Sequence, residues 1–379
     1  MKKKLVILIT LTMIALSYIG CEKNESPVAP EKTEFSESTI AEIDAAIEEV
    51  MNKNHIPGVI VGAWFPNEGT YIAAKGVSNT ITNEPMNIDN HFRIGSVTKT
   101  FAGTTVLQLV DEGKINLDSS LAYYLPEYPF SQADKITVRM LGKMQSGIIS
   151  YNEVLEFWGP FVQSNYWETF SADSLVKIAL SQDSLYHPGK GWNYSNTNFA
   201  LLGLICEKVT GTRIDDLIKN KICRPNKLQN TYWPLSEFLP EPYSHGYTRS
   251  YLNGQIIDAT YNNPSWADAA GILISNIYDL KEWMSLVGNG SLYSSAMVQE
   301  RINWVESLPS NKSYGFALGY YSGWIGHSGE LPGYNTFAMY FPPKDAIIVI
   351  HVNSDINDPG VDILKAITKI LSPDNIPYE

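Results

Sequence analysis

Apolar residues near the start of the chain recur at helical spacing and then change to the continuous runs typical of buried strands. Between Thr39 and His55 the apolar side chains share one face; they are Ile40, Ile43, Ile47, Val50 and Met51. This spacing predicts an amphipathic helix, and Thr39 with Glu42 three residues later matches a capping box at its start. Two strands, Val59–Phe65 and Tyr71–Gly76, are predicted on either side of a turn that contains proline and glycine.

The middle of the chain, roughly residues 96–225, carries helical patterns and few strand patterns. The predicted helices include Val97–Val110, Asn196–Lys208 and Arg213–Ile222. The chain then returns to apolar runs between turn residues, which predict strands at Gly315–Tyr321, Trp324–His327, Asn335–Phe341 and Ala346–Val352. A Pro-Pro-Lys-Asp turn predicts that the last two strands form an antiparallel hairpin. A final helix is predicted from Asp358-Pro359 to Leu371.

Strands at both ends of the chain and helices between them predict one architecture. We expect an α/β fold of the α+β type, in which an antiparallel sheet from both chain ends is flanked by helices and carries an inserted, mostly helical domain. The expected boundaries are residues 38–100 and 240–379 for the α/β domain and 101–239 for the helical domain. A cleft between two such lobes is the expected place for a site.

Residues 1–20 have the organisation of a signal peptide, with three lysines followed by an apolar run from Leu5 to Ile19. The run ends at Gly20-Cys21, which resembles a bacterial lipoprotein cleavage site, although Tyr18 stands where such sites usually carry leucine. We therefore expect lipid attachment at Cys21, a Glu/Ser/Pro-rich tether over residues 21–37, and an extracytoplasmic, membrane-anchored protein in the periplasm or at the cell surface. The alternative is an ordinary secretory signal that leaves Cys21 unmodified.

The chain is acidic, with 28 Lys and Arg, 40 Asp and Glu, and a formal net charge of −12. Loss of residues 1–20 removes three lysines and no acid, which leaves 25 basic and 40 acidic side chains and a net charge of −15. Such a surface argues against nucleic acid as a partner and against a polybasic membrane patch. For Cys206 and Cys223, two buried free thiols are favoured over a disulfide, which export would permit.

Ser96 and Lys99 are three residues apart at the start of a predicted apolar helix. Residues at this spacing are neighbours on one helix face, so the amine is expected within reach of the hydroxyl. A serine hydroxyl needs a base to become a nucleophile, and burial lowers the pKa of a lysine toward that role. Ser174 and Lys177 share the spacing, but their surroundings indicate the solvent-exposed face of an amphipathic helix. We therefore predict Ser96 as the nucleophile and Lys99 as its base.

Tyr194-Ser195-Asn196 leads into another apolar helix. A phenol beside a lysine can be ionised or hydrogen-bonded, and in either form it can move protons to a leaving group. Asn196 offers an amide donor and an acceptor, for the lysine and for an amide-bearing substrate. Two other Tyr-x-Asn sequences begin at Tyr251 and Tyr261, in a polar stretch that predicts turns. Tyr194 is therefore the predicted partner of the nucleophile.

His327-Ser328-Gly329 is predicted to end a strand, and Glu330 follows it. Glycine lets a substrate backbone approach a strand edge closely. An imidazole and a hydroxyl at that edge could bind a carboxylate or a carbonyl. A lone histidine is more often a structural residue, so His327 is a substrate-binding candidate only together with the other two motifs.

These three sequences, in this order, resemble the motifs of the serine β-lactamase and penicillin-binding-protein superfamily, most of all class C β-lactamases, D-alanyl-D-alanine carboxypeptidases and related esterases. The resemblance covers Thr39 to Leu371. It implies an acyl-enzyme mechanism in which Ser96 attacks a carbonyl and the backbone N–H groups of Ser96 and Glu330 hold the oxyanion. Its implied substrate-binding residues are Asn196, His327, Ser328, Gly329 and Glu330.

Two departures from the family pattern bear on the substrate. No Lys-Thr-Gly or Lys-Ser-Gly occurs, and the His-x-Gly in its place is typical of some D-Ala-D-Ala carboxypeptidases, D-amino-acid peptidases and esterases. Members also often carry His-Thr directly before a Ser-Gly pair. In this chain Met144-Gln145 stands in that place, before Ser146-Gly147. Substrate cannot therefore be transferred from any single relative.

The expected function is a D-alanyl-D-alanine carboxypeptidase-like or other D-amino-acid peptidase that acts on a small-molecule or peptide substrate. A carboxylesterase is the alternative, and β-lactam hydrolysis is less expected with His327 in the third motif. A non-catalytic binding or sensing protein is disfavoured, because such relatives usually lose a motif residue and this chain keeps Ser96, Lys99 and Tyr194. No metal and no cofactor are expected, because the six histidines lack metal-ligand spacing.

Overall fold

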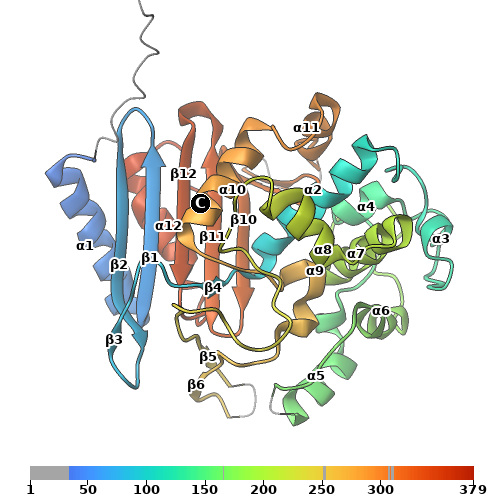
Figure 1. Ribbon diagram of the computed structural model, residues 1–379, viewed down its shortest axis with the longest axis horizontal. Coiled ribbons are helices and arrows are strands. Elements are labelled where there is room, and N and C mark those ends of the chain that lie inside the picture. The colour runs from blue at the N-terminus through green and yellow to red at the C-terminus, as the bar shows by residue number, and fades with distance from the viewer. Residues whose placement is uncertain (1–33, 165, 251–252, 306–307, 309–310) are drawn as a thin grey trace, which may run out of the picture.

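The structure is a computed structural model that describes residues 34–164, 166–250, 253–305, 308 and 311–379. Its centre is an eight-stranded antiparallel sheet in the order β3-β2-β1-β12-β11-β10-β9-β8, with helices on both faces (Figure 1). The expected fold class, an antiparallel sheet from both chain ends flanked by helices, is confirmed. Residues 1–33, which include the predicted signal peptide and Cys21, lie outside the described residues.

The sheet takes its strands from the two ends of the chain. They are β1 (Gly58–Phe65), β2 (Gly69–Asn79), β3 (Glu84–Pro85), β8 (Lys312–Tyr314), β9 (Gly319–Tyr321), β10 (Trp324–Leu331), β11 (Tyr334–Phe341) and β12 (Ala346–Val352). In the middle of the sheet β1 pairs with β12, and Val59 lies opposite Val352. Both of these strands are buried along their whole length, which explains why their sequences are continuous apolar runs.

Helices cover both faces of the sheet, and the sheet separates two apolar cores. On one face α1 (Glu37–Asn54) and α12 (Pro359–Leu371) pack together and enclose the smaller core. On the other face α10 (Ile277–Asn289) packs on β11 and β12, and the larger core continues from there among the remaining helices. Figure 1 shows these helices gathered beside the sheet, toward β10.

The remaining helices and short elements follow the chain from the first hairpin to the last strands. The α-helices are α2 (Thr98–Asp111), α3 (Leu121–Tyr124), α4 (Val138–Gly142), α5 (Leu155–Gln163), α6 (Ala172–Leu180), α7 (Asn196–Thr210), α8 (Ile214–Ile218), α9 (Asp268–Gly271) and α11 (Ser295–Arg301). Short turns of helix are η1 (Gly95–Val97), η2 (Tyr151–Glu153), η3 (Lys219–Cys223), η4 (Pro264–Ala267) and η5 (Pro342–Lys344). Two small sheets pair β4 (Phe92–Arg93) with β7 (Ile274–Ser275), and β5 (Tyr247–Arg249) with β6 (Ile256–Asp258).

The first helix begins earlier than the sequence predicted. The cap is Ser36, whose hydroxyl accepts a hydrogen bond from the backbone nitrogen of Thr39 at 3.2 Å. The predicted capping box of Thr39 and Glu42 is therefore wrong. Ser36 supplies the same cap chemistry one turn earlier, and Glu37 then adds a negative charge to the first turn, where the helix dipole favours it.

Three other predicted elements differ in the structure. The predicted strand Gly315–Tyr321 is wrong over its first half, because the chain turns there between β8 and β9 and Ala317 has a φ of 56°. The predicted helix Arg213–Ile222 is α8 followed by η3, which is π-helical. Strand β10 continues four residues past His327, to Leu331, so His327-Ser328-Gly329 does not end a strand. Pairing with β11 extends it, and that partner cannot be seen in the local pattern.

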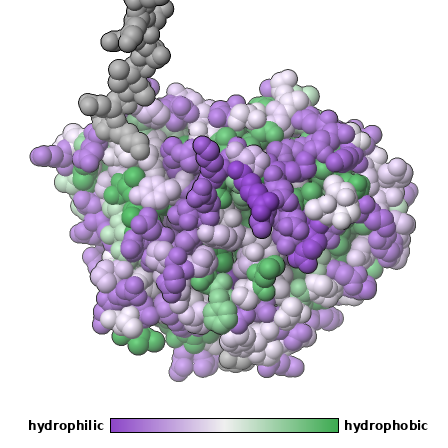
Figure 2. Space-filling model, in the orientation of Figure 1, coloured by the Kyte–Doolittle hydropathy of each residue, from purple (hydrophilic) through white to green (hydrophobic). Residues whose placement is uncertain are grey.

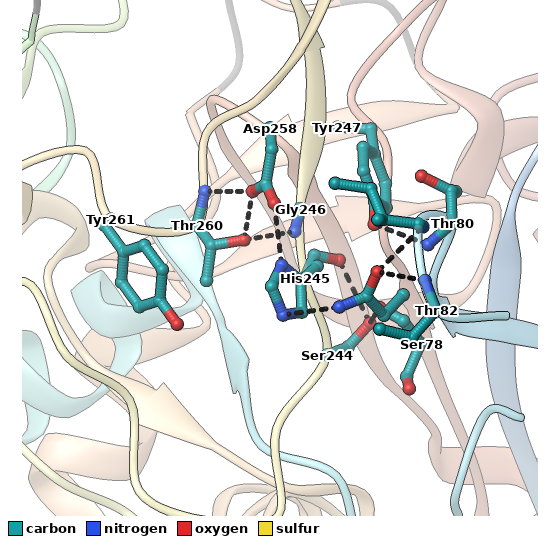
Figure 3. A network of polar contacts seen from close by, with 12 residues as sticks. Ser78, Thr80, Thr82, Ser244, His245, Gly246, Tyr247, Asp258, Thr260 and Tyr261 are labelled. Atoms are coloured by element: carbon teal, nitrogen blue, oxygen red, sulfur yellow. Dashed lines mark hydrogen bonds and ion pairs between the residues drawn. The ribbon is translucent and has the colours of Figure 1, made fainter. Parts of the chain in front are cut away.

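A polar network ties the β5–β6 hairpin to the end of β2 (Figure 3). His245 Nδ1 lies 2.7 Å from Asp258 Oδ2, and its Nε2 lies 3.1 Å from Asn79 Nδ2. Since the amide nitrogen can only donate, Nε2 accepts and Nδ1 donates to the carboxylate. The Tyr247 hydroxyl accepts from the backbone nitrogen of Thr80 at 2.8 Å. This histidine–aspartate pair thus has structural partners, and none of the described serine hydroxyls is bonded to the ring.

The surface in Figure 2 is mostly hydrophilic, with small groups of hydrophobic side chains between. Cys206 and Cys223 are both buried and free, as the favoured alternative predicted. Among the described residues no helix combines the length and the apolar character that a membrane span would need.

Candidate active site

Ser96 lies in η1, the turn that leads from β4 into α2. Gly95 before it has a φ of 51°, a left-handed conformation that favours glycine. A Cβ on Gly95 would lie 2.5 Å from the backbone nitrogen of Glu330, and a Cβ on Gly329 would lie 1.9 Å from the carbonyl oxygen of Ile94. The two glycines therefore let the Ser96 turn and strand β10 meet backbone to backbone.

The Lys99 side chain is fully buried one turn after Ser96. Its Nζ lies 2.9 Å from Ser96 Oγ, 2.7 Å from Asn196 Oδ1 and 2.6 Å from the carbonyl oxygen of Ala270. None of these three oxygens carries a formal charge. Burial therefore lowers the pKa of Lys99 well below that of an exposed lysine.

The three contacts of Lys99 suit both of its protonation states. As an ammonium it donates to all three oxygens. As a neutral amine it keeps two N–H groups, which the oxygens of Asn196 and Ala270 accept, and its lone pair then faces Ser96 Oγ. The neutral amine is thereby oriented to take the proton of the serine hydroxyl.

Tyr194 stands beside the same pair, as the sequence predicted. The centre of its ring is 4.7 Å from Lys99 Nζ, and its phenol is hydrogen-bonded to Ser96. Burial raises the pKa of Tyr194 above that of an exposed tyrosine, and the Ser96 hydrogen bond offsets only part of this rise. Of the two forms left open by the sequence, the structure thus favours the neutral phenol, which can donate a proton.

Asn196 is held between Lys99 and a residue that the sequence interpretation missed. Its Oδ1 accepts from Lys99, and its Nδ2 donates to Asn152 Oδ1 at 3.0 Å. The backbone nitrogen of Asn196 donates to Ser150 Oγ at 2.9 Å. Asn152 and Ser150 follow the Ser146-Gly147 sequence closely, and this run of polar side chains after a buried turn was the available signal.

His327 is buried in β10, away from water. Its Nδ1 lies 2.5 Å from the carbonyl oxygen of Ser328, and its Nε2 lies 3.0 Å from the Tyr314 hydroxyl. A carbonyl can only accept, so Nδ1 carries the proton and Nε2 accepts from the phenol. Burial, together with the charge of Lys99, lowers the pKa of His327 to about 3. His327 is therefore neutral at physiological pH.

The backbone nitrogens of Ser96 and Glu330, the predicted oxyanion donors, lie near each other where the Ser96 turn meets β10. Leu331 and Tyr334 close a two-residue hairpin, in which the closing pair exchanges hydrogen bonds. The N–H of Glu330, one residue earlier, consequently points away from β11, and β9 leaves that edge free because it pairs only with residues 324–326. A Cβ on Gly329 would lie 3.0 Å from the nitrogen of Ser96, so the Ser96 turn packs directly against β10 next to Glu330.

A cavity of about 200 Å³ opens onto the nucleophile. Its lining residues are Ser96, Tyr151, Asn152, Trp158, Asn196, Trp266, Ala267, Ala270, Gly271, Glu330, Leu331, Pro332 and Asp355. Three of the residues predicted from sequence line it, namely Ser96, Asn196 and Glu330. Lys99 and Tyr194 do not line it and lie behind Ser96. The third motif, His327, Ser328 and Gly329, does not line it either. Asp355 and the aromatic side chains were not predicted, since only the fold brings them here.

Larger hollows of about 320, 450, 490 and 690 Å³ lie elsewhere on the molecule. None of these four is lined by Ser96, Lys99 or Tyr194, so the smaller cavity is the candidate active site. Within the part of the chain that the structure describes, no three His, Cys, Asp or Glu side chains are grouped so that they could hold a metal ion.

Comparison with known sequences finds one family over most of the chain. The family model described as Beta-lactamase matches residues 43–371. Protein flp from Staphylococcus aureus (strain NCTC 8325 / PS 47) is 26% identical over 328 residues, which are 82% of this chain and 62% of that protein. The chain thus spans less than two thirds of the length of this curated relative.

Comparison with solved structures finds the same fold in amide-cleaving enzymes. A D-stereospecific amidohydrolase from Streptomyces sp. superposes with a TM-score of 0.79 at 30% identity, covering 86% of this chain and 98% of that one. A D-amino acid amidase from Ochrobactrum anthropi SV3, complexed with D-phenylalanine, superposes with a TM-score of 0.72 at 23% identity. The match covers 86% of this chain and 99% of that one. The second likeness is one of fold alone.

Proposed function

Since this chain belongs to the β-lactamase family, we propose that it is a serine hydrolase that cleaves amide bonds of D-amino-acid amides or peptides through an acyl-enzyme on Ser96. The observation that carries the proposal is the buried amine of Lys99, 2.9 Å from Ser96 Oγ and without an acidic partner among the residues that the structure describes. The amidohydrolase of the same fold at 30% identity supports the substrate class.

The proposed reaction uses the groups in the order in which they meet the substrate. Ser96 Oγ bonds to the amide carbon while neutral Lys99 takes its proton, and the N–H groups of Ser96 and Glu330 hold the oxyanion. The neutral phenol of Tyr194 then donates a proton to the nitrogen that leaves as the C–N bond breaks, and the proton held by Lys99 passes to the phenolate, so both groups return to their neutral forms. In the second half water gives its hydroxyl to the acyl carbon and its remaining proton to Ser96 Oγ as the ester C–O bond breaks.

The cavity favours an amidase or aminopeptidase over a carboxypeptidase within this substrate class. A carboxypeptidase must accept a terminal carboxylate, which a cation would bind. Among its described lining residues the cavity has no lysine, arginine or histidine, and it has two carboxylates, Glu330 and Asp355. His327 is neutral and adds no positive charge to the third motif.

A substrate panel tests the proposal. We expect the purified protein to release ammonia from D-alanine amide and D-phenylalanine amide, and Ser96→Ala to lose this activity by at least about 10³-fold. Ser174→Ala is the matched control, because Ser174 has the same Ser-x-x-Lys spacing outside the site and should keep wild-type rates.

The same panel distinguishes the alternatives. Release of D-alanine from an N-acylated D-Ala-D-Ala peptide, without hydrolysis of the amides, would establish the carboxypeptidase instead. Hydrolysis of p-nitrophenyl butyrate alone would establish the carboxylesterase. A Ser96→Ala variant as active on the amides as the wild type would refute the mechanism.

We also propose that the protein is exported and anchored to a membrane by lipid on Cys21. The support is the basic, then apolar, sequence ahead of Gly20-Cys21. In bacteria that express the full chain, metabolic labelling with a fatty-acid analogue should mark the protein and should disappear in Cys21→Ser. Equal labelling of both proteins would contradict the proposal, with Cys206→Ser as the control for labelling at another cysteine.

A further inference from the structure

Two carboxyl groups line the active-site cavity. They belong to Glu330 and Asp355, the acidic lining residues within the part of the chain that the structure describes, and burial together with the charges of Asp355 and Asp358 raises the pKa of Glu330 to about 7. They come from separate segments, Glu330 from β10 and Asp355 from the loop after β12. Asp355 acts electrostatically on Glu330, so the two carboxylates lie close enough to repel each other.

Asp355 has one satisfied and one unsatisfied carboxylate oxygen. Its Oδ2 accepts from the Thr248 hydroxyl at 2.8 Å, whereas Oδ1 is buried and has no hydrogen-bond partner among the described residues. Burial raises the pKa of Asp355 to about 6, while the Thr248 hydroxyl and the backbone N–H groups of Asp355 and Gly333 oppose this rise, so the carboxylate is mostly ionised at neutral pH. Oδ1 can accept a further hydrogen bond, and a ligand that brings a charged donor would stabilise it.

Tyr151 is a second, independent polar group at this cavity that a ligand could satisfy. Its side chain is fully buried and lines the same cavity, yet its hydroxyl has no hydrogen-bond partner among the described residues. Trp158 and Trp266 line the cavity beside it. These residues give the cavity an aromatic wall, which suits the apolar side chain of a small substrate.

Glu330 has the position that a group next to the scissile carbonyl needs. Its backbone N–H is one of the two proposed donors to the oxyanion, and the residue lines the same cavity as Ser96. Gly329 faces the Ser96 turn, so the Glu330 side chain leaves β10 from the opposite face and reaches the cavity around the free edge of the strand. In an amino-acid amide the α-amino nitrogen is only two bonds from the scissile carbonyl carbon, so it enters this cavity with the carbonyl.

We propose that Glu330 and Asp355 bind the free α-ammonium group of the substrate, so that the protein requires amino-acid amides or peptides with an unblocked amino terminus. This inference rests on the proposed amide hydrolysis at Ser96. The ammonium donates to the unpartnered Asp355 Oδ1 and to Glu330, and it relieves the repulsion between the two carboxylates. N-acylated substrates lose that charge and bring a neutral amide to the same place.

Paired substrates that differ only at this nitrogen test the inference. For the wild type we expect kcat/KM for D-phenylalanine amide to exceed that for N-acetyl-D-phenylalanine amide by about 10- to 100-fold, the range for a charge-assisted hydrogen bond. Asp355→Asn, which keeps the shape but not the charge, should reduce this ratio at least tenfold, and Glu330→Gln should also reduce it. The control Asp183→Asn, at an exposed aspartate that does not line the cavity, should keep the wild-type ratio.

A binding measurement separates this inference from the proposed chemistry. Calorimetric titration of Ser96→Ala should show tighter binding of D-phenylalanine amide than of its N-acetyl form, and the difference should vanish in Ser96→Ala/Asp355→Asn. If the wild type cleaves both substrates equally well, the ammonium site is refuted and the serine hydrolase stands. If the wild type cleaves no amide, the proposed function fails, and the titration still decides the ammonium site.

Discussion

At the scale of single residues, the most demanding requirement is a lysine that can lose its proton inside the protein. Lys99 meets it because three uncharged oxygens hold the amine and, in the described part of the chain, no carboxylate is bonded to it. Lys99→Arg should therefore reduce kcat/KM by about 10³-fold or more, because an arginine keeps its charge and cannot accept a proton. Amide hydrolysis with circular dichroism as a folding check measures this, and Lys177→Arg is the matched control. Activity within tenfold of wild type would exclude Lys99 as the base.

The same lysine should make stability depend on pH in a defined direction. Its pKa in the folded protein lies below the ordinary lysine value of about 10.4, so between these two values the unfolded chain binds more protons. Stability then rises with pH, by up to about 1.4 kcal/mol per pH unit from this group. The unfolding free energy of wild type minus that of Lys99→Met should accordingly grow as the pH is raised toward 10. Urea unfolding at several pH values measures it, and a difference that falls with pH would contradict the burial of a neutral amine.

Residue spacing predicted the contacts along one helix but not those made across the fold. Ser96 and Lys99 could be paired from the sequence because three residues make almost one helical turn. Asn152 and Asp355 could not be found in this way, since their partners Asn196 and Thr248 are distant in the chain. The neutral state of His327 also depends on its burial and on Tyr314, which no local pattern shows.

At the scale of elements, the contact between η1 and β10 positions the oxyanion donors. Gly95→Ala would place a methyl group 2.5 Å from the nitrogen of Glu330, so β10 would have to move away. We expect kcat/KM to fall by about 10²- to 10³-fold, the usual loss when one oxyanion donor is misplaced. The amide assay measures this loss.

Gly113 provides the matched control for backbone strain. It has a φ of 70°, also left-handed, but a Cβ there would meet nothing within 4 Å. Both Gly113→Ala and Gly95→Ala should therefore lower the free energy of unfolding by about 1 kcal/mol or more, because alanine is strained in the left-handed conformation. Only Gly95→Ala should lose activity at 25 °C. Equal activity loss in both variants would show that strain, and not the β10 contact, is responsible.

Elements with a long, regular pattern were predicted well, and short ones were not. The spans of β11 and β12 and the end of α12 at Leu371 agree with the sequence to within one residue. The two-residue strands β4 and β7 exist only because they pair with each other, so neither has a pattern of its own. The turn at Ala317 likewise interrupts an apolar run that, by composition, resembles one strand.

At the scale of the whole molecule, the helix pair α1 and α12 closes the face of the sheet opposite the active site. Ile363 on α12 is fully buried in the core beneath these helices. Ile363→Ala should cost about 2–5 kcal/mol of stability through lost burial and the cavity left behind, while kcat of the folded protein stays near wild type. Thermal unfolding and the amide assay measure the two effects, and Lys365→Ala is the control on the same helix. A stable variant with impaired kcat would show that this face is coupled to the site.

The pairing of β1 with β12 also constrains how the protein is made. The central partners of the sheet, with Val59 opposite Val352, come from the beginning and the end of the chain. During synthesis β1 and β2 must wait for almost the whole polypeptide to leave the ribosome before the sheet can close. Contacts between such distant segments also slow folding, because the connecting loop must be ordered first. A nascent chain of this topology therefore stays unfolded long enough for a translocase or a chaperone to bind it before its tertiary structure forms.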